Sequence, residues 1–138
     1  MNPHCLFCKI IAKDIEACIV YEDEHTLGFL DIHPRAPGHT MVVPRAHADT
    51  ILELHDGAIA SVFVAVKKVT LLLKQALNPD GFTIGINHGT AGGQAVDHLH
   101  IHIMPRWHTD GGTSIHSIVN NPFTEPLTVI AEKIKKIS

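Results

Sequence analysis

The chain has 138 residues, of which 45% are hydrophobic and 18% charged, a composition typical of one folded domain and not of a disordered tail. Its 11 basic and 14 acidic side chains leave a net charge of −3, so the charge balance does not indicate a nucleic-acid partner. The 12 histidines outnumber lysine and arginine together, which points to metal binding, imidazole catalysis or strong titration below pH 7.

The first half of the chain is predicted to hold short elements separated by turns. In chain order we expect a helical turn over Leu6–Ala12 and strands over Cys18–Tyr21, Leu27–Ile32 and His39–Val43. The segment 33–38 contains two prolines and a glycine and is predicted to be a loop. Pro44 is expected to end the third strand.

The second half begins with a long helix. Apolar residues recur there at steps of three and four, at Ile59, Val62, Phe63, Val66, Val69, Leu73 and Leu77. The sequence Asn-Pro-Asp-Gly at 78–81 ends that pattern. We then expect strands over Phe82–Asn87 and Val96–Met104, with Pro105 ending the latter, and a terminal helix over Leu127–Ile137.

Strands joined by short connections, with one long helix inserted between them, predict an antiparallel α+β fold. No repeat, linker or low-complexity tract divides the sequence, so we expect a single domain over residues 1–138. The three cysteines do not suit a disulfide framework, and Cys18 is expected to be a small buried side chain. Without a signal-peptide pattern or an apolar run near ~18 residues, a cytoplasmic protein with no membrane partner is expected.

The run His98-Leu99-His100-Ile101-His102 carries the strongest chemical signal in the sequence. On a strand, successive side chains alternate between faces, so the three imidazoles would share one face and the aliphatic residues the other. The apolar face could then pack on the long helix and leave the imidazoles facing a cleft. Three desolvated imidazoles are costly unless each has a partner or a task, which disfavours a purely structural role.

Two chemical interpretations of this run differ in what the imidazoles bind. A zinc site made of all three histidines is disfavoured, because a strand would separate the backbones of His98 and His102 by about 13 Å. Nucleophilic attack by one neutral imidazole on phosphorus fits better, since the unperturbed pKa of histidine is about 6.5. The preceding glycine-rich stretch, 87–94, could offer backbone N–H groups to a phosphate.

With those residues in place, the sequence resembles the histidine-triad (HIT) family of nucleotide-binding hydrolases. The resemblance covers nearly the whole chain and rests on the triad preceded by Gly92-Gly93-Gln94. Further matching stretches are Leu6–Ile11, Tyr21–Glu24, Phe29–Ile32, Pro37–His39 and Pro44–His47. The family implies a five-stranded antiparallel sheet with one long helix and a short C-terminal helix, and a homodimer that joins two sheets into one of ten strands.

The resemblance also implies a role for each matching residue. His100 would be the nucleophile, with His98 and His102 beside it and His39 behind the triad. His102 would contact the phosphate or leaving group, and Asp31 would bind the ribose hydroxyls. The remaining substrate-binding residues would be Phe7, Phe29 and Ile32 around a purine, and Asn87, Gly93, Gln94 and Ala95 around the phosphate. In the phosphoramidase branch the position of Ala95 is often serine, so this chain lacks that hydroxyl.

A second site involves the pair Cys5-x2-Cys8, which by itself is compatible with a redox pair, half of a metal site or coincidence. The absence of a thioredoxin-like pattern around it disfavours redox chemistry. Many bacterial members of the family bind zinc at this place, which implies a structural zinc on Cys5, Cys8, His47 and His98. In that arrangement His98 would bind metal and leave His100 free for chemistry.

The expected function is therefore hydrolysis of a purine nucleotide, such as a nucleoside 5′-phosphoramidate, through a covalent nucleotidyl-histidine that releases a nucleoside monophosphate. An AMP-like substrate and no metal for activating the nucleophile are expected. Two other interpretations stay open: dinucleoside polyphosphate hydrolysis, as in the fragile-histidine-triad branch, and a nucleotide-binding sensor with little catalysis.

Overall fold

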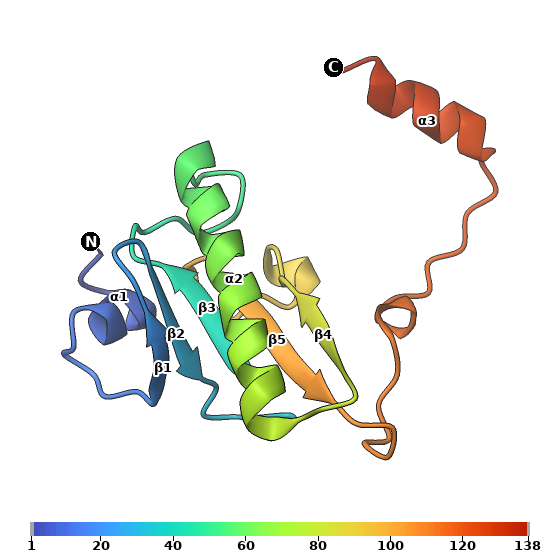
Figure 1. Cartoon of the computed structure of the whole chain (residues 1–138). Coiled ribbons are helices and arrows are strands. Elements are labelled where there is room, and N and C mark those ends of the chain that lie inside the picture. The colour runs from blue at the N-terminus through green and yellow to red at the C-terminus, as the bar shows by residue number, and fades with distance from the viewer. Residues whose placement is uncertain (1, 138) are drawn as a thin grey trace.

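The computed structural model describes residues 2–137, and its centre is one antiparallel sheet of five strands (Figure 1). The strands are β1 (Ile19–Glu22), β2 (Thr26–Leu30), β3 (Thr40–Pro44), β4 (Gly81–Gly85) and β5 (Ile101–Arg106). Their order is β1-β2-β3-β5-β4, so β5 is inserted between two strands that precede it in the chain. The predicted α+β class and five-stranded antiparallel sheet are confirmed.

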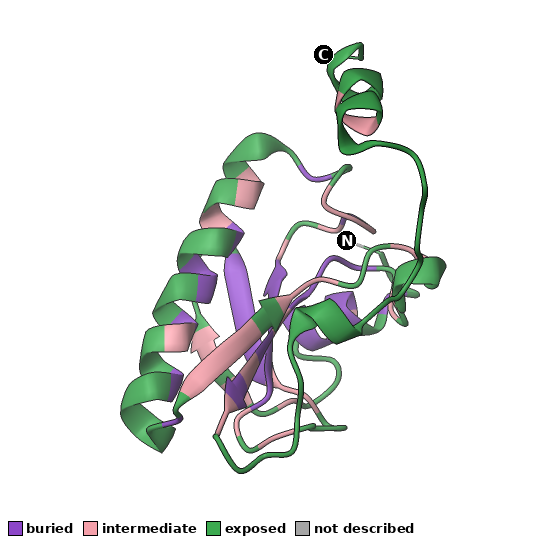
Figure 2. Cartoon of the chain, turned by 90° about the vertical axis from the view of Figure 1, so that its right-hand side faces the viewer, coloured by how far each residue is buried: buried purple, intermediate pink, exposed green. Residues whose placement is uncertain are grey.

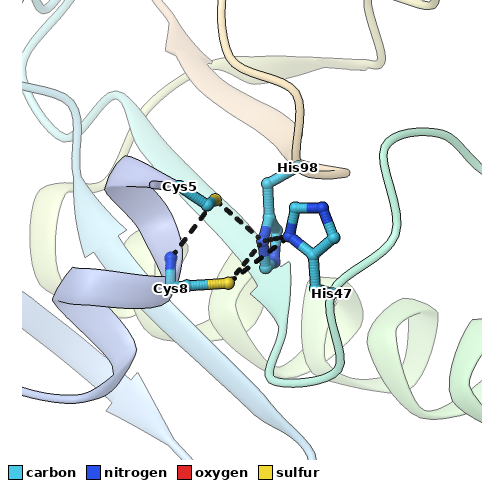
Figure 3. A group of neighbouring side chains, drawn as sticks. All are labelled: Cys5, Cys8, His47 and His98. Carbon is cyan, nitrogen blue, oxygen red and sulfur yellow. Dashed lines mark hydrogen bonds between the residues drawn. The ribbon is translucent and has the colours of Figure 1, made fainter. Parts of the chain in front are cut away.

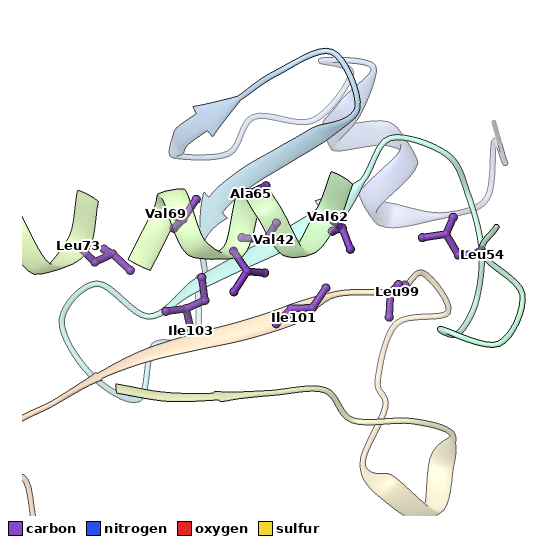
Figure 4. Close-up of a cluster of buried hydrophobic side chains, with 11 residues drawn as sticks. Val42, Leu54, Val62, Ala65, Val69, Leu73, Leu99, Ile101 and Ile103 are labelled. Carbon is purple, nitrogen blue, oxygen red and sulfur yellow. The ribbon is translucent and has the colours of Figure 1, made fainter. Parts of the chain in front are cut away.

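One face of the sheet is covered by the long helix α2 (Asp56–Leu77). The helix begins where the His55 ring accepts a hydrogen bond from the Ala58 N–H, and it ends at Asn78, whose φ of 49° is left-handed. Its buried residues pack on β3 and β5, as Figure 4 shows for Val42, Ile101 and Ile103. In Figure 2 the buried stretches of α2 are those that face the sheet.

The opposite face of the sheet is covered in two unequal parts. The short helix α1 (Leu6–Ile11) packs its buried side chains on residues of β2 and β3, including Phe29, Met41 and Val43. Over β4 and β5, no helix within residues 2–137 packs on this face. There the chain that follows β5 contributes Ile115 and Ile118 to the wall of a cavity. The side chains of β5 that point to this face therefore border a cavity.

The segment beyond β5 leaves the body of the molecule. It runs through the short helical turn η2 (Ile115–Ser117) to the helix α3 (Leu127–Lys135). The helix α3 stands apart from the sheet in Figures 1 and 2. Apolar side chains such as Leu127 and Ile134 are exposed there. The predicted terminal helix is confirmed, although this chain does not cover its apolar side. Among the described residues, no helix combines the length and hydrophobicity that crossing a bilayer requires.

Several expected boundaries are wrong. Strand β5 begins at Ile101 and not at Val96, because the preceding backbone bends, with the His98 N–H bonded to the Val96 carbonyl. Pro105 lies within β5, which is tolerated because pairing with β3 has already ended at Ile103. Pro44 is likewise the last residue of β3. Cys18 is exposed, since it precedes the edge strand β1 and is not part of the core.

Candidate functional site

The histidine run lies where the chain enters β5. Leu99, Ile101 and Ile103 are buried in the core under α2, so the predicted alternation of side chains between two faces is confirmed. The expectation that all three imidazoles face a cleft is wrong for the first of them. His98 is fully buried and directed at α1, whereas His102 lines the cavity.

The ring of His100 is held in one orientation and one tautomer. Its Nδ1 lies 2.7 Å from the His98 carbonyl oxygen, which can only accept, so Nδ1 carries the proton. The Nε2 atom then keeps its lone pair. Edge-to-face packing fixes the ring between Phe7 and His102, with centroid distances of 5.1 and 5.0 Å. The side chain is only 6% exposed, which shields the lone pair from bulk water.

His102 has the opposite tautomer, because His39 determines it. The Arg35 backbone N–H donates to Nδ1 of His39 at 3.1 Å, so neutral His39 carries its proton on Nε2. That Nε2 lies 2.9 Å from Nδ1 of His102 and 3.5 Å from a carboxylate oxygen of Asp31. His102 therefore accepts at Nδ1 and holds a proton on Nε2. Burial, assisted by the neighbouring imidazoles, lowers the pKa of His102 to about 4 and favours this neutral state.

A cavity of about 390 Å³ opens beside these rings on the sheet face opposite α2. Asp31, His39 and His102 form one end of its wall, and Asn87 also borders it. Burial lowers the pKa of His39, and the nearby Arg35 charge lowers it further, although the Asp31 carboxylate raises it in part. The imidazoles of His39 and His102 are therefore neutral and act as hydrogen-bond donors or acceptors. The arrangement suits a phosphate ester held near two neutral rings.

Four side chains gather under α1 and form a candidate metal centre (Figure 3). Nδ1 of His98 lies 3.5 Å from Cys5 Sγ and 3.6 Å from Cys8 Sγ, and Nδ1 of His47 lies 3.4 Å from Cys8 Sγ. The start of α1 supplies both sulfurs, because Cys5 is the N-cap residue, Cys8 lies in the first turn, and a spacing of three residues places them on one side.

The donor set fits a tetrahedral cation. Nε2 of His98 donates to the Pro44 carbonyl at 2.8 Å, and Nε2 of His47 donates to the Asp49 carboxylate at 2.9 Å. Both Nδ1 atoms are therefore unprotonated, yet they lie 3.2 Å apart and direct lone pairs at each other. A tetrahedron with zinc bond lengths has edges of about 3.3–3.8 Å. The Cys5, Cys8, His47 and His98 cluster can thus hold a metal ion.

The glycine-rich loop differs from the expected phosphate cradle. The backbone N–H groups of Gly93 and Gln94 donate to carbonyls within the loop, to Thr90 and Gly89, so they are already engaged. The Gln94 amide also bonds within the protein, donating to the Asp49 and Val96 carbonyls and accepting from the Gly89 N–H. By contrast, the Ala95 N–H has no hydrogen-bond partner among residues 2–137, and Asn87 borders the cavity.

The residues expected around a purine lie on the α1 side of His100. Phe7 and Phe29 pack edge to face with centroids 5.4 Å apart and are both buried. Ile32 lies on the surface and is 81% exposed, so the structure does not bring it into that cluster. Asp31 borders the cavity, and one of its carboxylate oxygens accepts from the His33 N–H at 2.8 Å.

Four residues near the two sites escaped the sequence analysis. Asp49 orients His47, and only its spacing of two residues from that histidine could have indicated it. Arg35 borders the cavity from a loop whose sequence predicts only irregular structure. Ile115 and Ile118 reach the cavity from an exposed segment, and no local pattern signals that contact.

The fold and the paired sites define a histidine-triad protein. The family model described as the HIT domain matches residues 12–109, and the chain belongs to this family. It is 49% identical over 107 residues to a HIT-like protein of Methanocaldococcus jannaschii, covering 78% of this chain and 82% of that protein. It is also 38% identical over 111 residues to an adenosine 5′-monophosphoramidase of Schizosaccharomyces pombe, covering 80% of each.

Solved structures agree with this assignment. A Bacillus subtilis member of the HIT family superposes with a TM-score of 0.85 at 38% identity, covering 96% of both chains. A zinc-bound histidine-triad protein of Mycobacterium smegmatis superposes with a TM-score of 0.75 at 36% identity, covering 78% of both chains. The family therefore includes a nucleotide phosphoramidase by name and a zinc-bound structure.

Proposed function

We propose that this protein hydrolyses purine nucleotides by transferring the nucleotidyl group to His100 and then to water, which releases a nucleoside monophosphate. The observation that carries the proposal is the hydrogen bond from His100 Nδ1 to the His98 carbonyl, since it leaves Nε2 unprotonated beside the cavity-lining His102. The phosphoramidase named among the relatives, and an adenylylsulfatase of Arabidopsis thaliana 35% identical over 110 residues, support a nucleotidyl substrate.

In the first step, Nε2 of His100 forms a bond to the α-phosphorus while the bond to the leaving group breaks. The leaving nitrogen or oxygen takes the proton from Nε2 of His102, whose tautomer His39 maintains, and a proton from solvent replaces it so that the ring stays neutral. Water then attacks phosphorus, displaces the imidazole of His100 and releases its second proton to solvent. Asn87 and the free N–H of Ala95 are the proposed phosphate donors, and Gly93 and Gln94 hold their loop in shape.

The nucleoside is proposed to lie toward α1. Phe7 and Phe29 would support the base, Ile32 would cover it from the surface, and Asp31 would accept from the ribose hydroxyls. Asp31 is suited to this because one of its oxygens is 3.5 Å from His39 and only weakly engaged.

We further propose that the metal centre holds zinc with a structural role. A zinc ion there would cross-link the start of α1 to the segment preceding β5. It would also neutralise the charge of two thiolates. Cys5, Cys8 and His47 then fix the backbone of His98, and the His98 carbonyl in turn orients His100. Reduced cysteines at this site suit a cytoplasmic location.

The chain is proposed to act as one HIT domain in a homodimer. Strand β4 is an edge strand, and Ile84 on it and Phe63 and Leu71 on the outer side of α2 are exposed. Pairing of two β4 edges would give the ten-stranded sheet. Light scattering after size exclusion at micromolar concentration is expected to give twice the chain mass, and a monomer would contradict this proposal.

The central test is the replacement His100→Gly. Turnover of an adenosine phosphoramidate is expected to fall by at least about 1,000-fold while AMP still binds, because the nucleophile is lost but not the pocket. The exposed His116 serves as a matched control, and His116→Gly should leave turnover unchanged.

Quenching of the wild type during turnover with denaturant at alkaline pH, where a bond between phosphorus and imidazole survives, followed by peptide mass analysis, should find the nucleotidyl group on His100. Retained turnover in His100→Gly would refute the covalent mechanism. Tight AMP binding by a wild-type protein that never forms the adduct would instead indicate a nucleotide sensor.

A further inference from the structure

The side-chain amide of Gln94 uses all of its donors inside the protein. Its oxygen accepts from the Gly89 N–H at 2.8 Å, and its NH2 group donates to the Asp49 and Val96 carbonyl oxygens at 2.7 and 3.0 Å. Because the Gly89 N–H can only donate and the two carbonyls can only accept, this orientation of the amide satisfies all three contacts. Neither N–H of Gln94 is left for a phosphate, so Gln94 acts on a substrate only through the loop that it holds.

These bonds fix the loop 89–95, which carries the proposed phosphate donor. The bonds to Gly89 and Val96 hold its two ends, and the Ala95 N–H lies between Gln94 and Val96 in the chain. The bond to Asp49 differs from the other two. Within residues 2–137 it is the hydrogen bond that joins this loop to a segment distant in the chain.

Asp49 is also bonded to the metal centre. Its carboxylate accepts from Nε2 of His47 at 2.9 Å, and its own N–H donates to the Glu53 carboxylate at 3.0 Å. A carboxylate in this place orients the ring, so that Nδ1 of His47 faces the metal position. Asp49 thus contacts a metal ligand through its side chain and the phosphate loop through its main chain.

A metal ion would hold together the same two segments that Gln94 bridges. His47 lies in the segment that follows β3, and His98 lies in the segment that precedes β5 (Figure 3). The Leu99 N–H also bonds the Ala48 carbonyl at 2.8 Å. Nδ1 of His47 and Nδ1 of His98 lie 3.2 Å apart with opposed lone pairs, and a cation between them replaces this repulsion by two bonds.

We infer that metal binding at the metal centre and phosphate binding at the loop 89–95 strengthen each other, and that Asp49 and Gln94 are the positioning residues that connect them. The inference rests on the proposed function, which places the phosphate at the Ala95 N–H. Each ligand orders segments that the other ligand also needs ordered, so the second to bind loses less conformational entropy. The coupling is reciprocal, because one free energy is shared by both binding equilibria.

Linkage in the wild type is the direct test. The Zn²⁺ dissociation constant, measured by competition with a chromophoric chelator, should be at least about 5-fold lower with saturating AMP than without it. Adenosine, which lacks the phosphate, should leave this constant unchanged. Competition by free AMP for zinc would not lower it. An unchanged constant with AMP, or an equal decrease with adenosine, would overturn the inference.

Variants test the two connecting residues separately. Gln94→Ala removes the bond to the Asp49 carbonyl, so AMP should then change the zinc dissociation constant by less than about 2-fold. The exposed Gln75→Ala on α2 is the matched control and should keep the wild-type effect. A full effect of AMP in Gln94→Ala would refute the connection.

Asp49→Asn keeps the main-chain carbonyl but removes the charge beside His47. Zinc should therefore bind about 10- to 100-fold more weakly in the absence of AMP. The exposed Asp56→Asn at the start of α2 is the control and should bind zinc as the wild type does. Equal zinc affinity in Asp49→Asn and the wild type would refute the positioning role of this carboxylate.

Hydrogen exchange gives a readout that needs no nucleotide. Removal of zinc from the wild type should speed exchange of the Gly93 and Gln94 amides, which bond within the loop, several-fold more than that of the Val69 amide in α2. In Gln94→Ala the loop amides should no longer respond more strongly than Val69. Equal acceleration of the loop and of α2 in the wild type would indicate only global destabilisation and contradict the coupling.

The adduct on His100 separates this inference from the proposed function. If the adduct forms but AMP leaves the zinc affinity unchanged, the inference fails and the proposed function stands. If AMP strengthens zinc binding but no adduct ever forms, the coupling stands and the proposed chemistry fails. A wild type that does not bind AMP at all would overturn both.

Discussion

Nε2 of His39 lies 2.9 Å from Nδ1 of His102, and this contact places the proton of His102 on the nitrogen that points away from His39. The orientation is set one step further back, by the Arg35 backbone N–H that bonds His39 Nδ1. Two neutral rings in series thus present a single donor toward the substrate. We therefore propose that His39 is a positioning residue that need not touch the substrate.

Replacing His39 tests that role. His39→Phe should lower kcat for an alkylamine phosphoramidate by about 100-fold with little change in KM, because general acid catalysis is impaired while binding is not. A substrate with a good leaving group, such as a nitrophenyl ester of AMP, should be much less affected, since its departure needs no proton. The exposed His25 is the control, and His25→Phe should leave both rates unchanged. Equal losses for both substrates would indicate a merely structural role.

Metal removal should destabilise the fold. Elemental analysis is expected to find about one zinc ion per chain, and Cys8→Ser should abolish it because one thiolate of four ligands is lost. The melting temperature should then fall by roughly 5–15 °C. Cys18→Ser is a matched control at an exposed cysteine and should keep both metal and stability. A metal-free wild type that melts at the same temperature would contradict the proposed role.

Stability should decrease with acidification between pH 6.5 and pH 4. Burial lowers the pKa of His102 from 6.5 to about 4, so in this range the unfolded chain binds a proton that the folded chain does not. This stabilisation is fully present above pH 6.5 and is lost as pH falls toward 4. Urea titrations should give a lower free energy of unfolding at pH 5 than at pH 7.5. His102 should account for on the order of 1–2 kcal/mol of that difference, and this contribution should disappear in His102→Asn. Because His102 is not in the metal centre, the difference between wild type and variant excludes effects of metal release. If the free energy of unfolding changes equally with pH in the wild type and in His102→Asn, this assignment to His102 is refuted.

Gly38 allows a close packing contact next to β3. Its φ is +84°, and a Cβ there would lie 2.5 Å from Cδ1 of Leu77 and 3.2 Å from Cγ of Pro105. Gly38→Ala is therefore expected to lower the free energy of unfolding by about 2–4 kcal/mol, from backbone strain and crowding together. Gly111→Ala shares the left-handed backbone, with φ +69° and open space around it, and should cost only about 1 kcal/mol. Equal losses in denaturant titrations would show that the contact with Leu77 is unimportant.

Much of the architecture follows from local patterns in the sequence. The recurrence of apolar residues at three and four positions predicts α2, and alternation predicts that Leu99, Ile101 and Ile103 share the core under it. Such patterns are local because helix and strand periodicity depend only on neighbouring residues. The four residues of the metal centre were implied by family resemblance, because the spacing of Cys5 and Cys8 alone leaves their role open.

The tertiary structure decided what each imidazole can do. Three histidines in one run are chemically identical in sequence, but each ring meets a different partner. The Pro44 carbonyl accepts from Nε2 of His98, the His98 carbonyl accepts from Nδ1 of His100, and the His39 ring donates to Nδ1 of His102. The same holds for the loop at 89–94, whose N–H groups bond within the loop, and for Arg35, Ile115 and Ile118, which meet at one cavity from distant segments. The sequence thus determined which side chains are available. The tautomer of each imidazole, the direction of its N–H group and the wall of the cavity depend on partners far along the chain, because only folding brings these partners within hydrogen-bond distance.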